Sequence, residues 1–497
     1  MINITLQLPL RPSLSTVIGN VDYTRFRLEL ERIEELLVKS GAEKDFIERS
    51  IKQYIASAVS AGTKVNQSRL LSHQTRSVIA LRSMVLMSIL GEDFRGMSRR
   101  LAECQLFRYF CGLECIGDIR VPSKSTLQKY SQWLPEAEMR EVIGKLIQAA
   151  GEGRTGLELA NDVELERVWL DSTCVKANMH FPVDWVLLRD GVRTLMKATA
   201  LIRRHGLKSR MDDPAEFLKS MNRLSIEMTQ SRRSKDAKRL RKKCLRKMKK
   251  LVHVITEHAQ RHRELLDREW EKTDWTRKQA EQVLRRIDGV LELLPKAQKQ
   301  AHERIIGERS VTNKDKLLSL YETETRVIVR GKAGAEVEFG NTLLLAEQEN
   351  GLLVDWAFYR ESAPVDSKLL SPSIERISRL TGKPVTVVTT DRGFDSDDNT
   401  RLLNEKKIVN NICPKSPRQL GERMKDTQFA AAQKRRGATE GRIGVFKNVF
   451  LGSPMRAKQS HHRELAITWR VLAHNLWVLA RMPKMNAQET QPLKAAA

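Results

Sequence analysis

A long helical stretch divides the strand-forming parts of this sequence, and it restricts the folds that the chain can adopt. Residues 167–173 form a strand pattern, and apolar residues at three-to-four spacing then predict helices through residues 186–308. Strand patterns return at residues 325–329, 337–347, 352–359 and 385–390. Helical patterns alternate with them at residues 367–380, 397–405, 429–446 and 463–481. This order predicts an α/β or α+β core, with a mixed sheet and flanking helices, whose first strand is followed by a helical insertion.

The chain is therefore expected to have four parts. Residues 1–155 are predicted to form a helical N-terminal domain for DNA binding or dimerisation. Residues 160–190 and 312–483 would form the core that contains the sheet, and residues 190–311 would form the basic helical insertion. Residues 484–497 are predicted to be a disordered tail.

Basic residues strongly outnumber acidic ones. The 497-residue chain has 87 Lys and Arg against 61 Asp and Glu, which gives a formal charge of +26. Such a charge is informative about partners rather than about the fold. Because neutralising phosphates releases counterions, DNA or RNA is the leading candidate partner. A ribosome-like or merely soluble basic protein is the alternative, although 41% apolar residues are enough to build real cores.

Cysteine usage and the lack of long apolar runs indicate a cytoplasmic protein. The six Cys residues are scattered and show neither a disulfide framework nor a zinc-finger spacing, which fits a reducing cytosol. No apolar run approaches the roughly eighteen residues that a membrane span needs, so no membrane partner is expected. Residues 1–12 lack a basic segment followed by an apolar stretch, and we therefore expect no signal peptide.

The N-terminal part ends with a candidate DNA-reading helix. Ser123 or Ser125 can serve as its N-cap. The arrangement resembles a helix-turn-helix whose second helix enters a major groove. Plain packing of a small helical domain is an equally good explanation. The polar side chains that this helix would expose are Lys124, Gln128 and Lys129.

The insertion contains a strongly basic segment. Residues 231–250 hold twelve Lys or Arg and one acidic residue. Apolar stripes at residues 240–259 and 283–294 predict two helices that pack as an antiparallel arm, the second ended by Pro295. The charged face is either simply solvated or lies along a polyanion. The second alternative is favoured because so many like charges repel one another unless an anion is near. In the second case the candidate phosphate contacts include Arg239, Arg241, Lys242 and Lys243.

Two aspartates follow strand patterns directly. Asp171 comes after Val168-Trp169-Leu170, and a carboxylate in or at the end of a buried strand is costly unless a cation compensates it. Asp391 ends a β-branched run, and open α/β sheets place ligands at the carboxyl ends of their strands. Each alone has a simpler explanation: a hydrogen bond to a loop for Asp171, and an Asp turn for Asp391.

Glu440 is the candidate third ligand. It shares a helical row with Arg436, Gly444 and Lys447, which suits a site that holds metal ions and phosphate together. For Glu440 alone, salt bridges along the helix are the simpler explanation. Phosphodiester cleavage puts charge on the attacking and leaving oxygens, and two divalent ions roughly 4 Å apart stabilise both. Three carboxylates satisfy the ligand count for two Mg²⁺ (or Mn²⁺) ions.

The sequence resembles the DDE transposases of bacterial insertion sequences. Arg436-x₃-Glu440-x₆-Lys447 has the spacing of the Tyr-x₂-Arg-x₃-Glu-x₆-Lys signature of one group, with Gln433 at the Tyr position. The segments around Asp171 and residues 390–394 are similar to the strands of the first and second family aspartates. Residues 329–340 resemble the intervening hairpin, and residues 95–134 resemble the N-terminal domain.

The resemblance implies an RNase H-like catalytic core with two bound ions. Asp171 would bridge the ions, and Asp391 and Glu440 would each complete one. The family acts on double-stranded DNA, usually as a homodimer on paired element ends. Water attacks first, and the freed 3′-hydroxyl then attacks target DNA. A bacterial protein of this kind would be cytoplasmic, and associated with the nucleoid when bound.

The basic residues beside the three carboxylates are the candidate DNA contacts of this site. By the same resemblance, Arg436 and Lys447 would hold the phosphates that flank the cut. Arg392 and Arg442 stand next to the predicted ligands and are further candidates.

Two other classes compete with the transposase. A plain RNase H-like nuclease needs the metal site alone, and a catalytically idle DNA-binding relative needs no intact site. The three acidic positions are present, which disfavours the idle relative. The N-terminal domain and the basic insertion favour the transposase over the nuclease.

Overall fold

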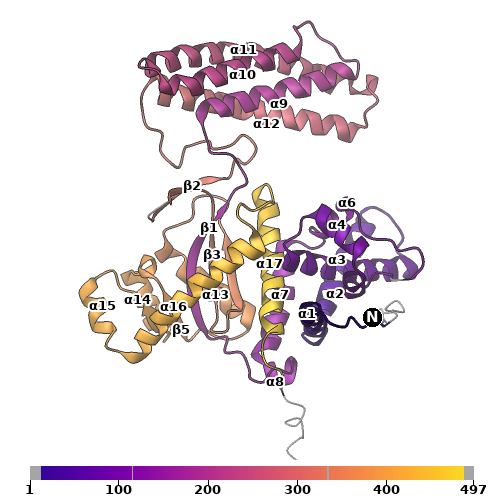
Figure 1. The fold of residues 1–497 in the computed structure, drawn as a ribbon, viewed down its shortest axis with the longest axis vertical. Coiled ribbons are helices and arrows are strands. Elements are labelled where there is room, and N and C mark those ends of the chain that lie inside the picture. Colours follow the sequence, from indigo (N-terminus) through magenta and orange to yellow (C-terminus); the bar gives the residue numbers. More distant parts are fainter. Residues whose placement is uncertain (1–12, 115, 333–334, 486–497) are drawn as a thin grey trace, which may run out of the picture. The chain divides into compact units, whose positions relative to one another are not determined.

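The computed structural model describes residues 13–114, 116–332 and 335–485, and it divides into two compact units (Figure 1). Unit 1 comprises Met1–Lys176, Thr342–Tyr359 and Ala363–Ala497, and unit 2 comprises Ala177–Asn341 and Arg360–Ser362. The expected absence of a signal peptide concerns residues 1–12, which lie outside the described residues. Most of the predicted tail lies outside them too. Lys484 pairs with Leu159 in an isolated bridge.

The described strands form one mixed sheet of six strands with flanking helices, which confirms the expected mixed α/β class. The strands are β1 Arg167–Lys176, β2 Arg326–Lys332, β3 Ala335–Glu347, β4 Leu353–Phe358, β5 Val387–Thr390 and β6 Val409–Ile412. Their order is β2-β3-β1-β5-β6, and β4 also pairs with β3. β1, β5 and β6 are parallel neighbours, whereas β3 runs antiparallel to β2 and to β4. The sequence pattern did not predict β6, a short strand with two asparagines at its centre.

The helices of unit 1 cover the sheet and share its core. α16 Thr427–Val445 contacts β1, β5 and β6, while α13 Leu370–Thr381 and α17 Ser460–Ala480 contact β4. α7 Glu136–Gly151 packs on α13 and α17, and α14 Asp397–Glu405 packs on β6. β5 is a β-branched run, and buried apolar residues flank the half-buried Asp171 and Ser172 in β1, as expected of strands in the interior of a sheet.

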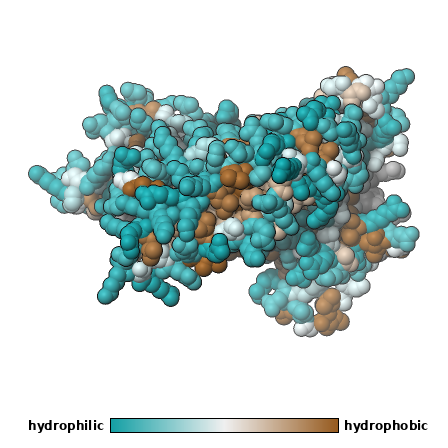
Figure 2. Space-filling model, turned by 90° about the horizontal axis from the view of Figure 1, so that it is seen from above, coloured by the Kyte–Doolittle hydropathy of each residue, from teal (hydrophilic) through white to brown (hydrophobic). Residues whose placement is uncertain are grey.

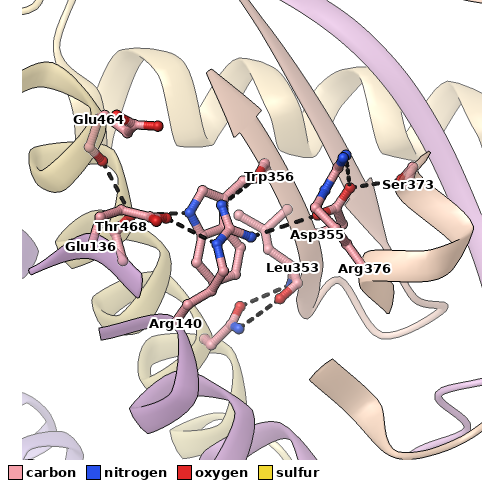
Figure 3. Close-up of polar contacts among 10 residues, drawn as sticks. Glu136, Arg140, Leu353, Asp355, Trp356, Ser373, Arg376, Glu464 and Thr468 are labelled. Atoms are coloured by element: carbon pink, nitrogen blue, oxygen red, sulfur yellow. Dashed lines mark hydrogen bonds and ion pairs between the residues drawn. The ribbon is translucent and has the colours of Figure 1, made fainter. Parts of the chain in front are cut away.

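A buried polar network ties β4 to three helices (Figure 3). Asp355 of β4 is fully buried, and its carboxylate accepts hydrogen bonds from Arg376 Nη2 at 2.7 Å and Ser373 Oγ at 2.7 Å, both on α13. Trp356 Nε1 donates to Thr468 Oγ1 of α17 at 3.0 Å, and Arg140 Nη2 of α7 donates to the Trp356 carbonyl at 2.7 Å. Because the buried carboxylate is fully paired, it fixes β4 against these helices instead of destabilising the core.

The N-terminal helices pack into the same hydrophobic core as the sheet. They are α1 Val21–Lys39, α2 Ala42–Ser60, α3 Gln67–Leu90, α4 Phe94–Glu103, α5 Gln105–Cys111, α6 Lys124–Tyr130 and α8 Gly153–Gly156. Of the two expected N-caps of α6, Ser123 is the one used, and its hydroxyl accepts from the Thr126 amide at 3.3 Å. Lys124, Gln128 and Lys129 are exposed on this helix, as expected from the sequence.

Unit 2 contains four long helices around a core of its own. They are α9 Asp184–Arg204, α10 Pro214–Gln230, α11 Ala237–Glu269 and α12 Arg277–Ala301. The expected two-helix arm is incomplete, because α9 and α10 also pack on α11. The expected end at Pro295 is wrong: α12 continues to Ala301, and buried Leu294 and Ala297 on either side of the proline hold the helix in the core. Proline removes one hydrogen bond, and this packing offsets the loss.

Among the helices of the described residues, none combines the length and the apolar character needed to cross a lipid bilayer.

Candidate active site

Asp171 and Asp391 lie side by side on neighbouring strands. β1 and β5 are parallel, with Trp169 opposite Thr389. Asp171 and Asp391 each lie two residues further along the chain, so the register brings them to the same level. Asp171 lies within β1 and is half-buried, and its Oδ1 accepts from the Ser172 amide at 2.8 Å. Asp391 directly follows β5, and its Oδ1 accepts from the Gly393 amide at 2.9 Å. The parallel register therefore pairs the two carboxylates that the sequence singled out.

Glu440 completes an acidic group around Asp171. It lies on α16, which crosses β1, β5 and β6. Burial, and after it the negative charges of Asp391 and Glu440, raise the pKa of the Asp171 carboxyl to about 6. The Ser172 amide and the Arg436 guanidinium act in the opposite direction but do not offset these causes. Asp391 and Glu440 are thus both close enough to Asp171 to disfavour its charged form, which is the electrostatic state expected of a site that binds a cation.

The side chain of Glu440 is engaged with a cation of its own helix. Arg436 Nη1 donates to Glu440 Oε1 at 2.6 Å, one turn away, and Glu440 is half exposed. In the part of the chain that the structure describes, no three His, Cys, Asp or Glu side chains are arranged to hold a metal ion as they stand. The donor chemistry and the mutual repulsion of the carboxylates fit a divalent ion, but an ion would compete with Arg436 for Glu440.

α16 is fixed on the sheet by contacts that the sequence did not predict. Arg435 Nη1 donates to the buried Glu347 carboxylate of β3 at 2.6 Å, and its guanidinium stacks over the Trp169 ring at 4.3 Å. Gln433, at the position of the family tyrosine, donates from Nε2 to the backbone carbonyls of Thr390 and Asn411 at 3.2 and 2.7 Å. These contacts attach α16 to β3, β1, β5 and β6, and so set the position of Glu440.

A helical spacing could have revealed part of this attachment. Arg435, Thr439 and Arg442 recur every three to four residues and form a row beside that of Arg436 and Glu440. Arg442, predicted to contact DNA, lies 3.5 Å from Glu347 and donates to the Glu349 carbonyl at 2.8 Å. The partner on the sheet, Glu347, is distant in sequence and carries no local signal.

Lys447 lies beyond the end of the α-helical part of its row. α16 ends at Val445, and Phe446–Leu451 continues as a wider π-helix. Because a π-helix has more residues per turn, it rotates Lys447 away from the position that a continuous α-helix would give. Lys447 is half-buried there.

The remaining predicted DNA contacts are mostly accessible to solvent. Arg392, which follows Asp391, is exposed, as are Arg239 and Lys243 of α11. Arg241 and Lys242 are half-buried, and Lys242 Nζ lies 2.8 Å from a Glu308 carboxylate oxygen. The face seen in Figure 2 is predominantly hydrophilic, with apolar residues in separate small groups. The contact between Lys242 and Glu308 means that part of the charge on α11 is already paired within unit 2.

No protein family, no curated protein and no solved structure matches this chain.

Proposed function

We propose that this protein is a DDE transposase: it binds the ends of a DNA element, cleaves phosphodiester bonds and transfers the freed strand to target DNA. The observation that carries the proposal is the grouping of Asp391 and Glu440, both far away in sequence, around Asp171 where β1 and β5 lie side by side. Burial and the two neighbouring negative charges together perturb the pKa of Asp171. Such groups cluster at functional sites more often than at structural ones.

The topology of the sheet supports an RNase H-like core. β4, β3, β1, β5 and β6 are adjacent in this order, and the first carboxylate comes from the central strand β1. The second comes from its parallel neighbour β5, and the third comes from the helix that packs across both. This is the arrangement that the resemblance of the sequence implies for such a core.

The proposed cofactor is a pair of Mg²⁺ or Mn²⁺ ions held by Asp171, Asp391 and Glu440. When bound, the ions would stabilise the charge on the attacking and leaving oxygens of the phosphate. Arg436 now neutralises Glu440, and it would be free to contact the phosphate once Glu440 serves as a ligand. Asp171, with its raised pKa, must lose its proton before it can serve as a ligand, and a nearby cation favours that loss.

The proposed partners are double-stranded DNA and a second copy of the chain at paired element ends. The formal charge of +26 and the exposed basic residues of α6 and α11 support DNA binding. The described cysteines carry reduced thiols, which is compatible with the proposed cytoplasmic location.

The test is cleavage and joining of DNA that carries the coding sequence with its natural flanks, incubated with purified protein and Mg²⁺. We expect cuts in the flanks and covalent joining of the freed ends to a target plasmid. Asp171→Asn, Asp391→Asn and Glu440→Gln should each abolish both steps while DNA binding persists. Asp397→Asn, which removes an exposed carboxylate at the start of α14, is the matched control and should retain both.

The outcomes separate the competing classes of protein. Cutting without joining would identify a metal-dependent nuclease instead. Near-normal cutting by any of the three site variants would remove that residue from its assigned role. Binding without any cutting by the wild type would identify a catalytically idle relative.

A further inference from the structure

A cavity of about 370 Å³ lies in unit 1 between α3, α4, α6 and α17. Its lining does not include Asp171, Asp391 or Glu440. Met84 and Met87 of α3 form part of its apolar wall, and Gln128 of α6 contributes a polar part. Trp469 Nε1 of α17 donates to the Ser131 carbonyl at 3.0 Å, which fixes α17 against the end of α6. The cavity wall is thus a rigid joint between these helices.

Three cationic side chains and one histidine, whose pKa is lowered by burial, line this cavity. Arg456 and Lys458 precede α17, His462 lies in its first turn and Arg470 lies two turns further along. The first turn of α17 contains no acidic residue. Because a helix N-terminus carries partial positive charge, basic side chains there are unfavourable unless an anion is near.

Arg470 is the strongest indication of a missing anion. It is half-buried, and its Nε donates to the Phe450 carbonyl at 3.3 Å. No carboxylate of the described residues forms an ion pair with it. Burial and the positive charge of Arg456 lower the pKa of Arg470 to about 10. A partly buried arginine without a carboxylate partner has a desolvation cost that one carbonyl contact does not offset.

The two acidic residues of the cavity do not pair with Arg470. Asp93 Oδ1 caps α4 by accepting from the Arg95 and Gly96 amides at 3.0 and 2.7 Å. Its other carboxylate oxygen lies 3.8 Å from Arg456, a long contact between exposed side chains. Glu92 Oε1 accepts from Arg100 Nε at 3.1 Å. Neither carboxylate neutralises Arg470, and the cavity keeps a surplus of positive charge.

We propose that this cavity binds a phosphate group, and that in the DNA complex it holds a backbone phosphate beside α6. The planar guanidinium groups of Arg456 and Arg470 suit phosphate oxygens. Gln128 lines the cavity and belongs to the helix that also exposes Lys124 and Lys129. Phosphate contacts set the register of a reading helix, so the cavity would position α6 on the duplex. The DNA part of this inference rests on the proposed function.

The first arm of the test uses inorganic phosphate and the full chain, without divalent metal. Thermal unfolding is measured against phosphate, with sodium chloride at equal ionic strength as the reference. We expect a saturable rise in the unfolding temperature with phosphate but not with chloride. Arg470→Gln should weaken the apparent phosphate affinity about tenfold or more, the size expected from losing a charge-assisted hydrogen bond. Arg418→Gln removes an exposed charge from α15 Pro417–Arg423 and should leave the affinity unchanged.

A second variant protects this arm against a folding failure of Arg470→Gln. Arg456→Gln combined with Lys458→Gln changes rim residues, and the pair should weaken phosphate binding by a similar factor. Equal stabilisation by phosphate and chloride, or wild-type affinity in this double variant, would overturn the site.

The second arm identifies the source of the phosphate. A short DNA duplex should displace inorganic phosphate from the wild type, and the double variant should bind duplex with a salt slope reduced by about 1 to 2. The DNA assignment is overturned if phosphate binds, duplex does not displace it, and the double variant binds duplex with the wild-type salt slope. In that case the site takes a free phosphorylated molecule. If the wild type binds phosphate but no DNA at all, the proposed function fails and the phosphate site stands.

Discussion

Replacing Asp171 by Asn should stabilise the metal-free protein at neutral pH. The pKa of Asp171 is raised from its ordinary value of 3.8 to about 6, which means that the native state holds this proton more tightly than the unfolded chain does. Each tenfold change in proton affinity corresponds to about 1.4 kcal/mol, so ionised Asp171 costs the fold about 3 kcal/mol, as an order of magnitude. Asn has nearly the same shape and no charge, so it removes this cost.

The sign of the effect determines its pH dependence. Well below pH 3.8 the carboxyl is protonated in both states, and the Asn variant and the wild type should have similar free energies of unfolding. As the pH rises from 3.8 to about 6 the wild type loses stability relative to the variant, and above that the difference stays constant. Urea denaturation with EDTA, at fixed ionic strength and at several pH values, measures this difference.

Asp355→Asn is the matched control with the opposite sign. Asp355 is also buried, but it is paired with Arg376 and Ser373, so its replacement should destabilise unit 1 by about 3–5 kcal/mol. Added Mg²⁺ should stabilise the wild type and leave Asp171→Asn largely unaffected. If Asp171→Asn were no more stable than the wild type at pH 7, or if the difference did not change with pH, the repulsion argument would be refuted.

Three further predictions concern contacts of α16 and α11. Arg436→Ala or Lys447→Ala should weaken DNA binding across sequences and reduce cutting, because phosphate contacts carry little base preference; gel-shift and cleavage assays with unchanged values would contradict this. Changing Arg239, Arg241, Lys242 and Lys243 together to Gln should lower DNA affinity and reduce its salt slope by at most about 3.6, with little effect on thermal unfolding; a wild-type slope would make this surface a packing element. Glu347→Gln leaves Arg435 without its buried partner, so it should lower stability by about 3–5 kcal/mol and reduce cutting, whereas exposed Glu349→Gln should not; equal behaviour of the two variants in urea unfolding and cleavage would rule out the docking role of Glu347.

The mixed α/β class and most elements could be predicted because their patterns are local. The β-branched run of β5 and the apolar run of β4 identify strands without any knowledge of their neighbours. The predicted helix at residues 397–405 matches α14 Asp397–Glu405. β6 escaped because Asn410 and Asn411 are not typical of strands and become ordered only by pairing with β5. The packing of four helices in unit 2 was not predicted either, since a narrow apolar stripe does not reveal how many helices pack against it.

The candidate site could be predicted as three residues but not as an arrangement. A carboxylate directly after apolar strand residues singled out Asp171, the end of a β-branched run singled out Asp391, and a spaced signature singled out Glu440. The pairing of Glu440 with Arg436 needs side-chain geometry, because a one-turn spacing permits the ion pair without requiring it. The docking of Arg435 on Glu347 joins residues 88 positions apart, so no local pattern could indicate it.

The position of unit 2 in the chain has a consequence for how the protein is made. β1 pairs with β3 and β5, but residues 177–334 are synthesised before the first residue of β3. The nascent strand with Asp171 therefore has both of its edges unpaired while the ribosome synthesises the four helices of unit 2, which have a core of their own. Glu440 comes later still, so the acidic centre is assembled near the end of translation. A chain released before α16 would carry the four helices of unit 2 but would not bring Glu440 to Asp171 and Asp391.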